Sequence, residues 1–305
     1  MTSSTPQSPL RDDVLSGKRV LITGGGTGLG KELARAFSAH GAAVHICGRR
    51  PAVLESAVAE LSATTAHGGS VEQHICDVRE ADQIEAMVEQ IWQRGPLTGL
   101  INNAAANFIS PSVDISPRGF AAVRSTVMDG ALFSTLACGR RWIEQGLPGS
   151  VVSMLVTWVW TGSAYVLPSV MSKTALHAMT MSLAVEWGRH GIRVNAVAPG
   201  PFPTESAWEK LAPIPKANVG AASSAQVPMG RFGRIPELCN LMLFLQSDGC
   251  DYLTGQNIAI DGAHHLAAPS TFAELSQLTS ADWAEARDLV RGKAVQEKAQ
   301  RAPKD

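Results

Sequence analysis

Short runs of apolar residues alternate along the chain with longer segments whose apolar positions recur at helical spacing. The short runs predict seven strands, over Arg19–Thr23, Ala43–Cys47, Glu72–Cys76, Gly99–Ile101, Ser150–Met154, Arg193–Val197 and Asn257–Ile260. The segments between them predict helices over Gly30–Ala39, Ala52–Ala63, Glu80–Gln93, Arg118–Glu144, Ser172–Arg189 and Pro236–Gln246. Strands that are apolar almost throughout indicate cover on both faces, and strand–helix alternation is typical of parallel strands joined by right-handed crossovers. We therefore expect an α/β fold in which helices flank both faces of one parallel sheet.

Three regions depart from this rhythm. Residues 1–16 are polar and predict a flexible N-terminal segment, so that 17–265 form a single domain. Residues 199–230 are rich in proline and in small and polar residues, which predicts a long loop over a site. Residues 266–305 form a C-terminal extension. In it a helix is predicted from Ser280 to about Arg291, followed by a charged, frayed tail.

Composition narrows the class of protein. Hydrophobic residues make up 45% of the 305 residues, and 26 basic against 27 acidic side chains leave a formal net charge of −1. This balance favours neither nucleic acid nor an anionic membrane as a partner. The polar N-terminus resembles neither a secretory nor a transit peptide, and no apolar run reaches the roughly 18 residues of a membrane span. We expect a cytoplasmic protein.

The cysteines and histidines do not predict a metal site. The five cysteines are scattered without a CxxC pair, which indicates buried free thiols in a reducing compartment. His264 and His265 form the only adjacent histidine pair and are expected in a partly solvated loop.

A glycine-rich segment follows the first predicted strand directly and opens the first predicted helix. It reads Gly24-Gly25-Gly26-Thr27-Gly28-Leu29-Gly30. Glycines let the backbone approach a pyrophosphate, and a helix N-terminus offers unpaired N–H groups and a favourable dipole. This strand–loop–helix context predicts a Rossmann-type dinucleotide site in which Gly24, Gly26, Thr27, Gly28, Leu29 and Gly30 contact the cofactor.

The end of the second strand selects between the two nicotinamide cofactors. NAD binders usually place an acidic residue there to hold the ribose 2′-hydroxyl, but this chain has Gly48 followed by Arg49 and Arg50. A guanidinium binds a 2′-phosphate through paired, charge-assisted hydrogen bonds, so NADP(H) is predicted. The alternative is two solvated arginines at a helix entry. Asp77 and Val78 are expected near the adenine, and Asn103, Ala104 and Ala105 near the cofactor ribose.

With these segments in place, the chain resembles the short-chain dehydrogenase/reductase family over roughly residues 17–263. The matching residues are Thr23–Gly30, Asp77, Asn102–Ala105, Ser172-Lys173 and Asn195–Pro201. The resemblance implies a seven-stranded, doubly wound parallel sheet and a nicotinamide cofactor. It also implies a homotetramer packed through helices 118–144 and 170–189. It further places Pro199, Gly200, Pro201, Phe202 and Thr204 beside the cofactor.

The chain departs from the usual catalytic pattern of that family. Most members use a Tyr-x-x-x-Lys pair, in which tyrosine is the general acid/base and lysine holds the nicotinamide ribose. Lys173 is present, but Ser169 stands at the tyrosine position and Val156 at the position of the usual serine. Because a serine hydroxyl is a much weaker acid than a phenol, ordinary alcohol–ketone interconversion is not the expected reaction.

One branch of the family, the 2,4-dienoyl-CoA reductases of the mitochondrial type, resembles this chain in its Ser-x-x-x-Lys arrangement. The segment Asn103–Pro111, Thr161–Ser163 and Pro168-Ser169 also match that branch. The resemblance makes Asn107, Ser169 and Lys173 catalytic residues and implies an acyl-CoA as the small-molecule substrate. It places the following residues at or near the substrate: Arg79, Phe108, Ser116 and Lys210, with Lys210 where an arginine is usual.

The branch's catalytic tyrosine is replaced here by Trp158, whose indole N–H donates a hydrogen bond but cannot shuttle a proton. Water or a displaced group such as Tyr165 then supplies the proton, or the substrate differs and Trp158 is an aromatic wall. A dehydrogenase or reductase of a hydrophobic ketone, aldehyde or alcohol is the alternative enzyme, and an inactive NADP(H)-binding member is a third possibility.

Several of these residues also have purely structural interpretations. Asn107 can close a turn after the fourth strand, and Ser169 can be the N-cap of its helix. If residues 158–160 are extended, Trp158 and Trp160 point the same way and can both pack in the core.

Overall fold

Seven parallel strands form one sheet at the centre of the computed structural model, which describes residues 10–203, 224–267, 275 and 278–301. The sheet order is β3-β2-β1-β4-β5-β6-β7. The strands are β1 (Arg19–Thr23), β2 (Ala43–Gly48), β3 (Ser70–Ile75), β4 (Gly99–Asn102), β5 (Gly149–Met154), β6 (Ile192–Pro199) and β7 (Asn257–Ile260). The predicted fold class is confirmed, and every predicted strand is present. β3 begins two residues earlier than predicted because the Ser70 amide donates to the carbonyl of Ala42, at 3.0 Å.

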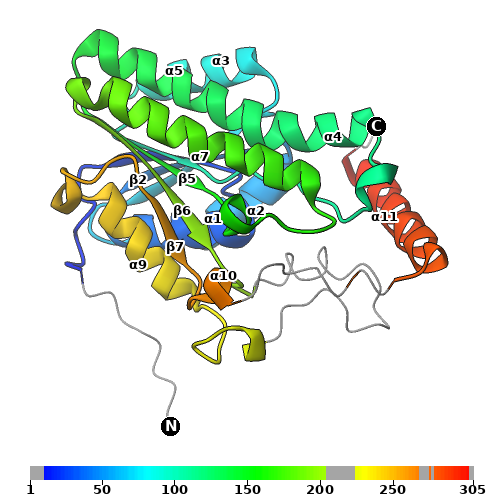
Figure 1. The fold of residues 1–305 in the computed structure, drawn as a ribbon. Helices are drawn as coiled ribbons and strands as arrows, with labels where there is room; N and C mark the ends of the chain where they lie inside the picture. Colours follow the sequence, from blue (N-terminus) through cyan, green and yellow to red (C-terminus); the bar gives the residue numbers. More distant parts are fainter. Residues whose placement is uncertain (1–9, 204–223, 268–274, 276–277, 302–305) are drawn as a thin grey trace.

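Helices cover both faces of the sheet (Figure 1). One face packs against α1 (Gly28–Ala39), α2 (Pro51–Ser62) and α9 (Ile235–Gln246). The other packs against α3 (Ala81–Trp92), α5 (Gly130–Gln145) and α7 (Leu167–Trp187), with α4 (Pro117–Arg124) leading into α5. Each face buries its own apolar cluster, as a sheet covered on both sides requires. Among the described helices, none is both long and apolar enough to cross a bilayer.

Short elements complete the chain. They are α6 (Trp158–Thr161), α10 (His264–Ala267), the π turn η2 (Ser125–Asp129), and the 3₁₀ turns η1 (Ser112–Asp114), η3 (Gly188–His190), η4 (Ser224–Gln226) and η5 (Asp248–Cys250). The C-terminal extension carries α11 (Ser280–Arg301), which continues about ten residues beyond its predicted end. All five cysteines are buried and free, as expected.

Two local expectations were wrong, and two of the alternative structural interpretations do not hold. The helix expected from Ser172 begins at Leu167, because Pro168 fits the first helical turn, where its missing N–H is not needed. Ser169 therefore lies inside that turn, and Val166 is the N-cap. Residues 158–161 are helical rather than extended, so Trp158 and Trp160 do not share a direction. The helix expected over 118–144 is interrupted by the π turn η2.

The histidine pair was also predicted in the wrong setting. His264 and His265 open the short helix α10, and His264 is buried rather than lying in a solvated loop. His265 is partly buried, and its Nδ1 lies 2.7 Å from an Asp261 carboxylate oxygen.

The strand order reverses between β1 and β4. Crossovers run outward in opposite directions from these two neighbours, so a crevice opens at their carboxyl ends. Val20 and Ile22 of β1 pair in register with Gly99 and Ile101 of β4, which brings the loops after both strands together. The candidate cofactor site lies at this point of the fold.

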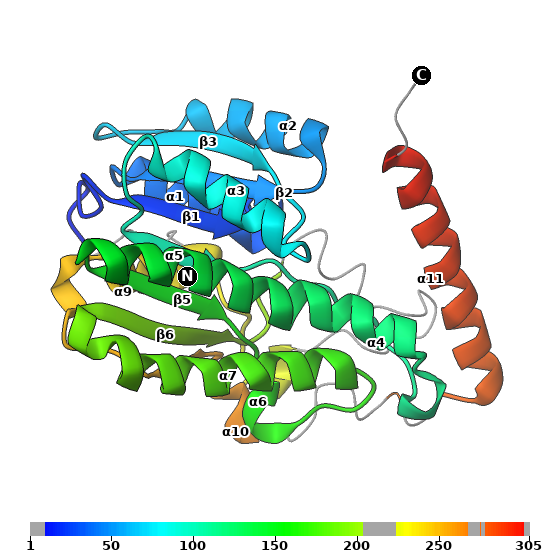
Figure 2. The ribbon, with the colours of Figure 1, turned by 90° about the horizontal axis from the view of Figure 1, so that it is seen from above.

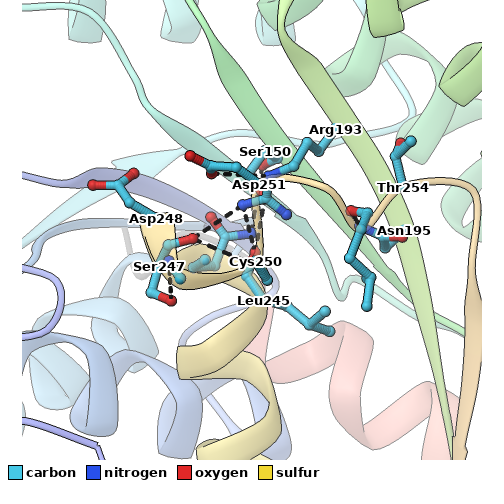
Figure 3. A network of polar contacts seen from close by, with 12 residues as sticks. Ser150, Arg193, Asn195, Leu245, Ser247, Asp248, Cys250, Asp251 and Thr254 are labelled. Atoms are coloured by element: carbon cyan, nitrogen blue, oxygen red, sulfur yellow. Dashed lines mark hydrogen bonds and ion pairs between the residues drawn. The ribbon is translucent and has the colours of Figure 1, made fainter.

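A buried arginine ties the start of β6 to the end of α9 (Figure 3). The Arg193 guanidinium donates to the carbonyls of Leu245, at 3.0 Å, and Ser247, at 3.2 Å. Its Nε also lies 3.7 Å from a carboxylate oxygen of Asp251. The last carbonyls of a helix have no intrahelical partners, and Arg193 donates to two of them at the end of α9. The Ser150 hydroxyl also donates to the Leu245 carbonyl, at 3.1 Å.

Replacing Arg193 by alanine is expected to destabilise the fold by about 1–3 kcal/mol, because the buried Ser247 carbonyl loses its guanidinium donor and the Leu245 carbonyl keeps only the hydrogen bond from the Ser150 hydroxyl. Urea unfolding measures this loss as a lower midpoint. The control is Arg189→Ala, which removes an exposed arginine of the preceding turn. Equal midpoints for the two variants would contradict the role assigned to Arg193.

Candidate active site

The glycine-rich loop after β1 is locked to the loop after β4. The Thr23 hydroxyl accepts hydrogen bonds from the backbone amides of Asn103 and Ala104, both at 3.0 Å. The Asn103 side-chain amide donates in return to the carbonyls of Thr23, at 3.0 Å, and Gly24, at 3.2 Å. A Cβ on Gly30 would lie 2.4 Å from that amide nitrogen, so this glycine is required by packing. The side chain of Asn103, predicted to contact cofactor, thus holds the loop.

The start of α1 has the features of an anion site. Thr27 is the N-cap, its side chain makes no capping hydrogen bond, and the first turn contains no acidic residue. Gly28 and Leu29 are partly exposed, and the amides of a first helical turn have no intrahelical partner. A Cβ on Gly26 would lie 3.2 Å from the Leu54 side chain, so a larger residue at position 26 would crowd the glycine-rich loop. Unpaired amides, a favourable helix dipole and small residues fit a pyrophosphate group.

A charged cluster lies at the carboxyl ends of β2 and β3. Arg79 Nε donates to both carboxylate oxygens of Asp77, at 2.9 and 3.0 Å, and Arg49 Nη1 lies 4.0 Å from the same carboxylate. Partial burial acts to raise the pKa of Asp77, but the hydrogen bonds and charge of Arg79, with the charge of Arg49, lower it overall. Arg49 and Arg50 are both exposed, and Arg50 is the N-cap of α2. Two cations therefore remain accessible beside the expected adenosine position.

The other residues predicted to contact the cofactor differ in how far they are exposed to solvent. Val78 is buried against Gly130 of α5, and Ala105 is exposed in the loop after β4. A Cβ on Gly200 would lie 2.5 Å from Asp261 Cβ, so only glycine fits at the end of β6. The Phe202 ring is buried against Gly233. Pro199 and Pro201 are partly buried near this strand end, while Thr204 lies outside the described residues.

Ser169 and Lys173 occupy one buried face of α7, one turn apart. Their exposed fractions are 4% and 5%. The Lys173 ammonium donates to the carbonyl of Met154, the last residue of β5. Burial lowers the pKa of Lys173 from its ordinary value of 10.5 to about 8. A buried lysine at the carboxyl end of a central strand is positioned to hold a polar ligand rather than to solvate the surface.

Asn107 lies in the loop after β4, and Trp158 begins α6 after β5. Asn107 is exposed, and its Oδ1 accepts the backbone N–H of Phe108 at 2.9 Å. That hydrogen bond orients the side-chain amide so that its Nδ2 group is the one available to donate. Trp158 is partly buried in an apolar cluster with Tyr165, Val166 and Ile109.

The possible proton source Tyr165 and the other residues predicted near the substrate have structural partners where the structure describes them. Ser116 is the N-cap of α4, and its hydroxyl accepts the Gly119 amide at 3.0 Å. Tyr165 has a left-handed backbone, with φ of 66°, and its ring stacks on Trp283 of α11. Phe108 packs beside α4, and Lys210 lies outside the described residues.

A histidine cluster also forms that the sequence spacing did not reveal. His45 of β2 lies 3.0 Å from His74 of β3, and Glu72 lies beside them. Arg19 donates to His45 Nε2 at 2.9 Å, which places the His45 proton on Nδ1, directed at His74. That nitrogen would have to lose its proton to bind a metal. The side chains of Arg19, His45 and His74 instead form a chain of hydrogen bonds.

Comparison with known proteins agrees with this geometry. Residues 24–265 match the family model described as enoyl-(acyl carrier protein) reductase. A probable 2,4-dienoyl-CoA reductase of Caenorhabditis elegans is 34% identical over 95% of this chain and 94% of its own length. A probable 2,4-dienoyl-CoA reductase of Bacillus subtilis (strain 168) is 38% identical over 82% of this chain and 97% of its own. The crystal structure of a short-chain dehydrogenase from Bacillus anthracis is 39% identical, covers 81% of this chain and 96% of its own, and has a TM-score of 0.72.

Proposed function

Because the chain belongs to the short-chain dehydrogenase/reductase family of oxidoreductases, we propose that it reduces an enoyl- or 2,4-dienoyl-CoA-like thioester with NADPH. The observation that carries this proposal is the buried pair on α7, with Ser169 one turn before Lys173 where most members of the family have tyrosine. The similarity to 2,4-dienoyl-CoA reductases extends over most of the chain and supports the same reaction class.

The residues present fit a phosphorylated nicotinamide dinucleotide. The α1 N-terminus would hold the pyrophosphate, and Lys173 the nicotinamide ribose. Arg49 and Arg50 would hold a 2′-phosphate through charge-assisted hydrogen bonds. When bound, the cofactor supplies a hydride to the far end of the conjugated substrate.

The chain's own groups then manage the charge that develops on the thioester. As the hydride adds, negative charge moves to the carbonyl oxygen and requires hydrogen-bond donors. The Asn107 amide and the Ser169 hydroxyl are the donors proposed for this oxygen, from the loop after β4 and from α7. The dienolate must finally take a proton on carbon, at the α-carbon to give the 3-enoyl product or at the γ-carbon to give the 2-enoyl product. Trp158 cannot provide that proton.

A spectrophotometric assay of NADPH oxidation with trans,trans-2,4-dienoyl-CoA tests the proposal. We expect saturable turnover and one enoyl-CoA product, with the protonated carbon identified by NMR. The comparison substrates are a 2-enoyl-CoA and a hydrophobic ketone without CoA. Turnover of the ketone alone would make the protein a carbonyl reductase, and saturable NADPH binding without any turnover would make it a non-catalytic binder. Either result would refute the proposed reaction.

The choice of cofactor has its own test. Replacing both Arg49 and Arg50 by alanine is expected to raise the Kd for NADPH by about 10–100-fold, because each guanidinium contributes a charge-assisted hydrogen bond to phosphate. The Kd for NADH, which lacks the 2′-phosphate, should change little. Arg189→Ala is the control, since this exposed arginine lies in the turn after α7. A parallel loss of affinity for both cofactors would contradict the assignment.

The proposed homotetramer is consistent with apolar side chains on the outer face of α7. Exposed large hydrophobic residues of this helix are Leu167, Met171, Met181 and Val185. Exposed apolar positions gathered on one helix are typical of an assembly surface.

A further inference from the structure

The C-terminal helix α11 lies beside the sheet end toward which the strand arrows point (Figure 2). Its start is fixed by reciprocal hydrogen bonds. The Asp282 carboxylate accepts the Thr279 amide at 2.7 Å, and the Thr279 hydroxyl accepts the Asp282 amide at 3.3 Å. A helix with such a cap begins at a defined residue, so the side chains that follow are presented in a fixed direction.

The name α11 clamp is used here for three residues near the start of α11 that contact the rest of the protein: Trp283, Ala286 and Arg287. Trp283 and Ala286 are 7% and 3% exposed, and they pack against Ile109 and Val166. The Trp283 and Tyr165 rings lie 4.8 Å apart at 36°. Arg287 Nη1 lies 2.8 Å from an Asp114 carboxylate oxygen.

Every one of these contacts falls on a segment that carries a proposed catalytic residue. Ile109 and Asp114 follow Asn107 in the loop after β4, and Tyr165 and Val166 precede Ser169. The two segments also meet directly, because the Ser110 amide donates to the Tyr165 carbonyl at 2.9 Å. The α11 clamp thus closes over the junction of the two segments.

Tyr165 shows why the junction needs support. Its φ of 66° lies in the left-handed region, which costs a non-glycine residue of order 1 kcal/mol and persists only where surrounding contacts hold it. The contacts that hold it are the stacking on Trp283 and the hydrogen bond from Ser110. The turn containing Tyr165 leads directly into the first turn of α7, where Ser169 lies.

We propose that α11 is a positioning element that holds Asn107 and Ser169 in their working arrangement, with Trp283 as its main contact. This inference rests on the proposed function for the roles of Asn107 and Ser169. It adds a part for the C-terminal extension, whose buried Trp283 and Ala286 share a cluster with Ile109 and Val166 and not the cluster that Leu29 of α1 joins. The α11 clamp therefore acts on turnover and not on cofactor binding.

The test uses the full chain carrying Trp283→Ala. We expect kcat with dienoyl-CoA to fall about 10-fold, since a displacement near 1 Å of a catalytic group costs up to about 10²-fold. The Kd for NADPH should stay within about twofold, because the site at α1 is separate. Trp283→Phe keeps an aromatic ring against Tyr165 and should retain most of the activity. Arg291→Ala, on the exposed side of α11, should match the wild type.

Hydrogen exchange provides a readout that does not need activity. In Trp283→Ala we expect faster exchange of the Ser110 and Ser169 amides, with the amides of β1 unchanged. If the wild type turns over no thioester, the proposed function fails while exchange still tests the α11 clamp. Wild-type exchange and wild-type kcat in Trp283→Ala would overturn the inference.

A second variant avoids the large cavity that Trp283→Ala creates. Arg287→Asp breaks the ion pair with Asp114 and should lower kcat, and adding Asp114→Arg should restore it. Failure of the charge-swapped double variant to recover any activity would show that the pair does not position the loop.

Discussion

Replacing Lys173 by methionine should lower kcat/KM for thioester reduction by about 10²–10³-fold and raise the Kd for NADPH by about 10–100-fold. The lysine ammonium is buried at the carboxyl end of β5, where it would donate to the nicotinamide ribose. Methionine has a similar length and no charge. Because burial of a charge is costly, the variant should fold with equal or higher stability. Stopped-flow turnover, cofactor titration and thermal unfolding together separate these effects.

The pH profile provides the internal control for Lys173. Its pKa of about 8 in the folded protein, set by burial, means that the ammonium is present below that pH. NADPH affinity should be constant below pH 8 and fall as the pH rises above it, and this limb should be absent in Lys173→Met. The unfolded chain keeps the lysine proton up to about 10.5, so the folded apoprotein gains stability between about pH 8 and 10.5. A wild-type profile without either change would contradict this assignment.

Replacing Trp158 by tyrosine should raise kcat, by about 10-fold or more, because general acid catalysis typically contributes 10²–10⁴-fold. The resemblance to the 2,4-dienoyl-CoA reductases predicts a catalytic tyrosine at the position of Trp158, which begins the single turn α6 in this fold. If protonation of the dienolate is slow for lack of a phenol, the wild type should show a solvent isotope effect on kcat that shrinks in the variant.

The matched control for this prediction is Trp158→Phe, which makes the same change in size without a hydroxyl. Its kcat should not rise. Tyr165→Phe should keep most of the turnover, because its ring can still stack on Trp283. An unchanged kcat in Trp158→Tyr would show that proton supply does not limit the reaction. A large loss in Tyr165→Phe would instead identify that phenol as the donor.

The sequence predicted the cofactor end of the fold well because its signals are contiguous. Seven apolar runs and the helical segments between them report strands buried on both faces, since each pattern depends on neighbouring residues. The glycine-rich loop, with its strand before and its helix after, is complete within residues 19–39. Even here the sequence did not show that the Asn103 side-chain amide also holds the glycine-rich loop.

The sequence predicted the substrate end less well because contacts there join distant segments. The Ser169 helix begins five residues earlier than expected, since Leu167 and Pro168 extend it past the apparent start signal. The same limit applies in the other half of the sheet, where His45 and Glu72 meet only through the pairing of β2 with β3. No local pattern could reveal that Arg287 reaches Asp114, 173 positions earlier in the chain.

What the sequence alone determined is therefore the α/β fold, its dinucleotide loop and the residue types available for chemistry. Local periodicity and glycine spacing encode these features. Only the tertiary structure decided which side chains meet. It buried Lys173 and so lowered its pKa, and it placed α11 against the loops that carry Asn107 and Ser169. Burial and long-range contact arise from the packing of whole elements, and a linear pattern does not record them.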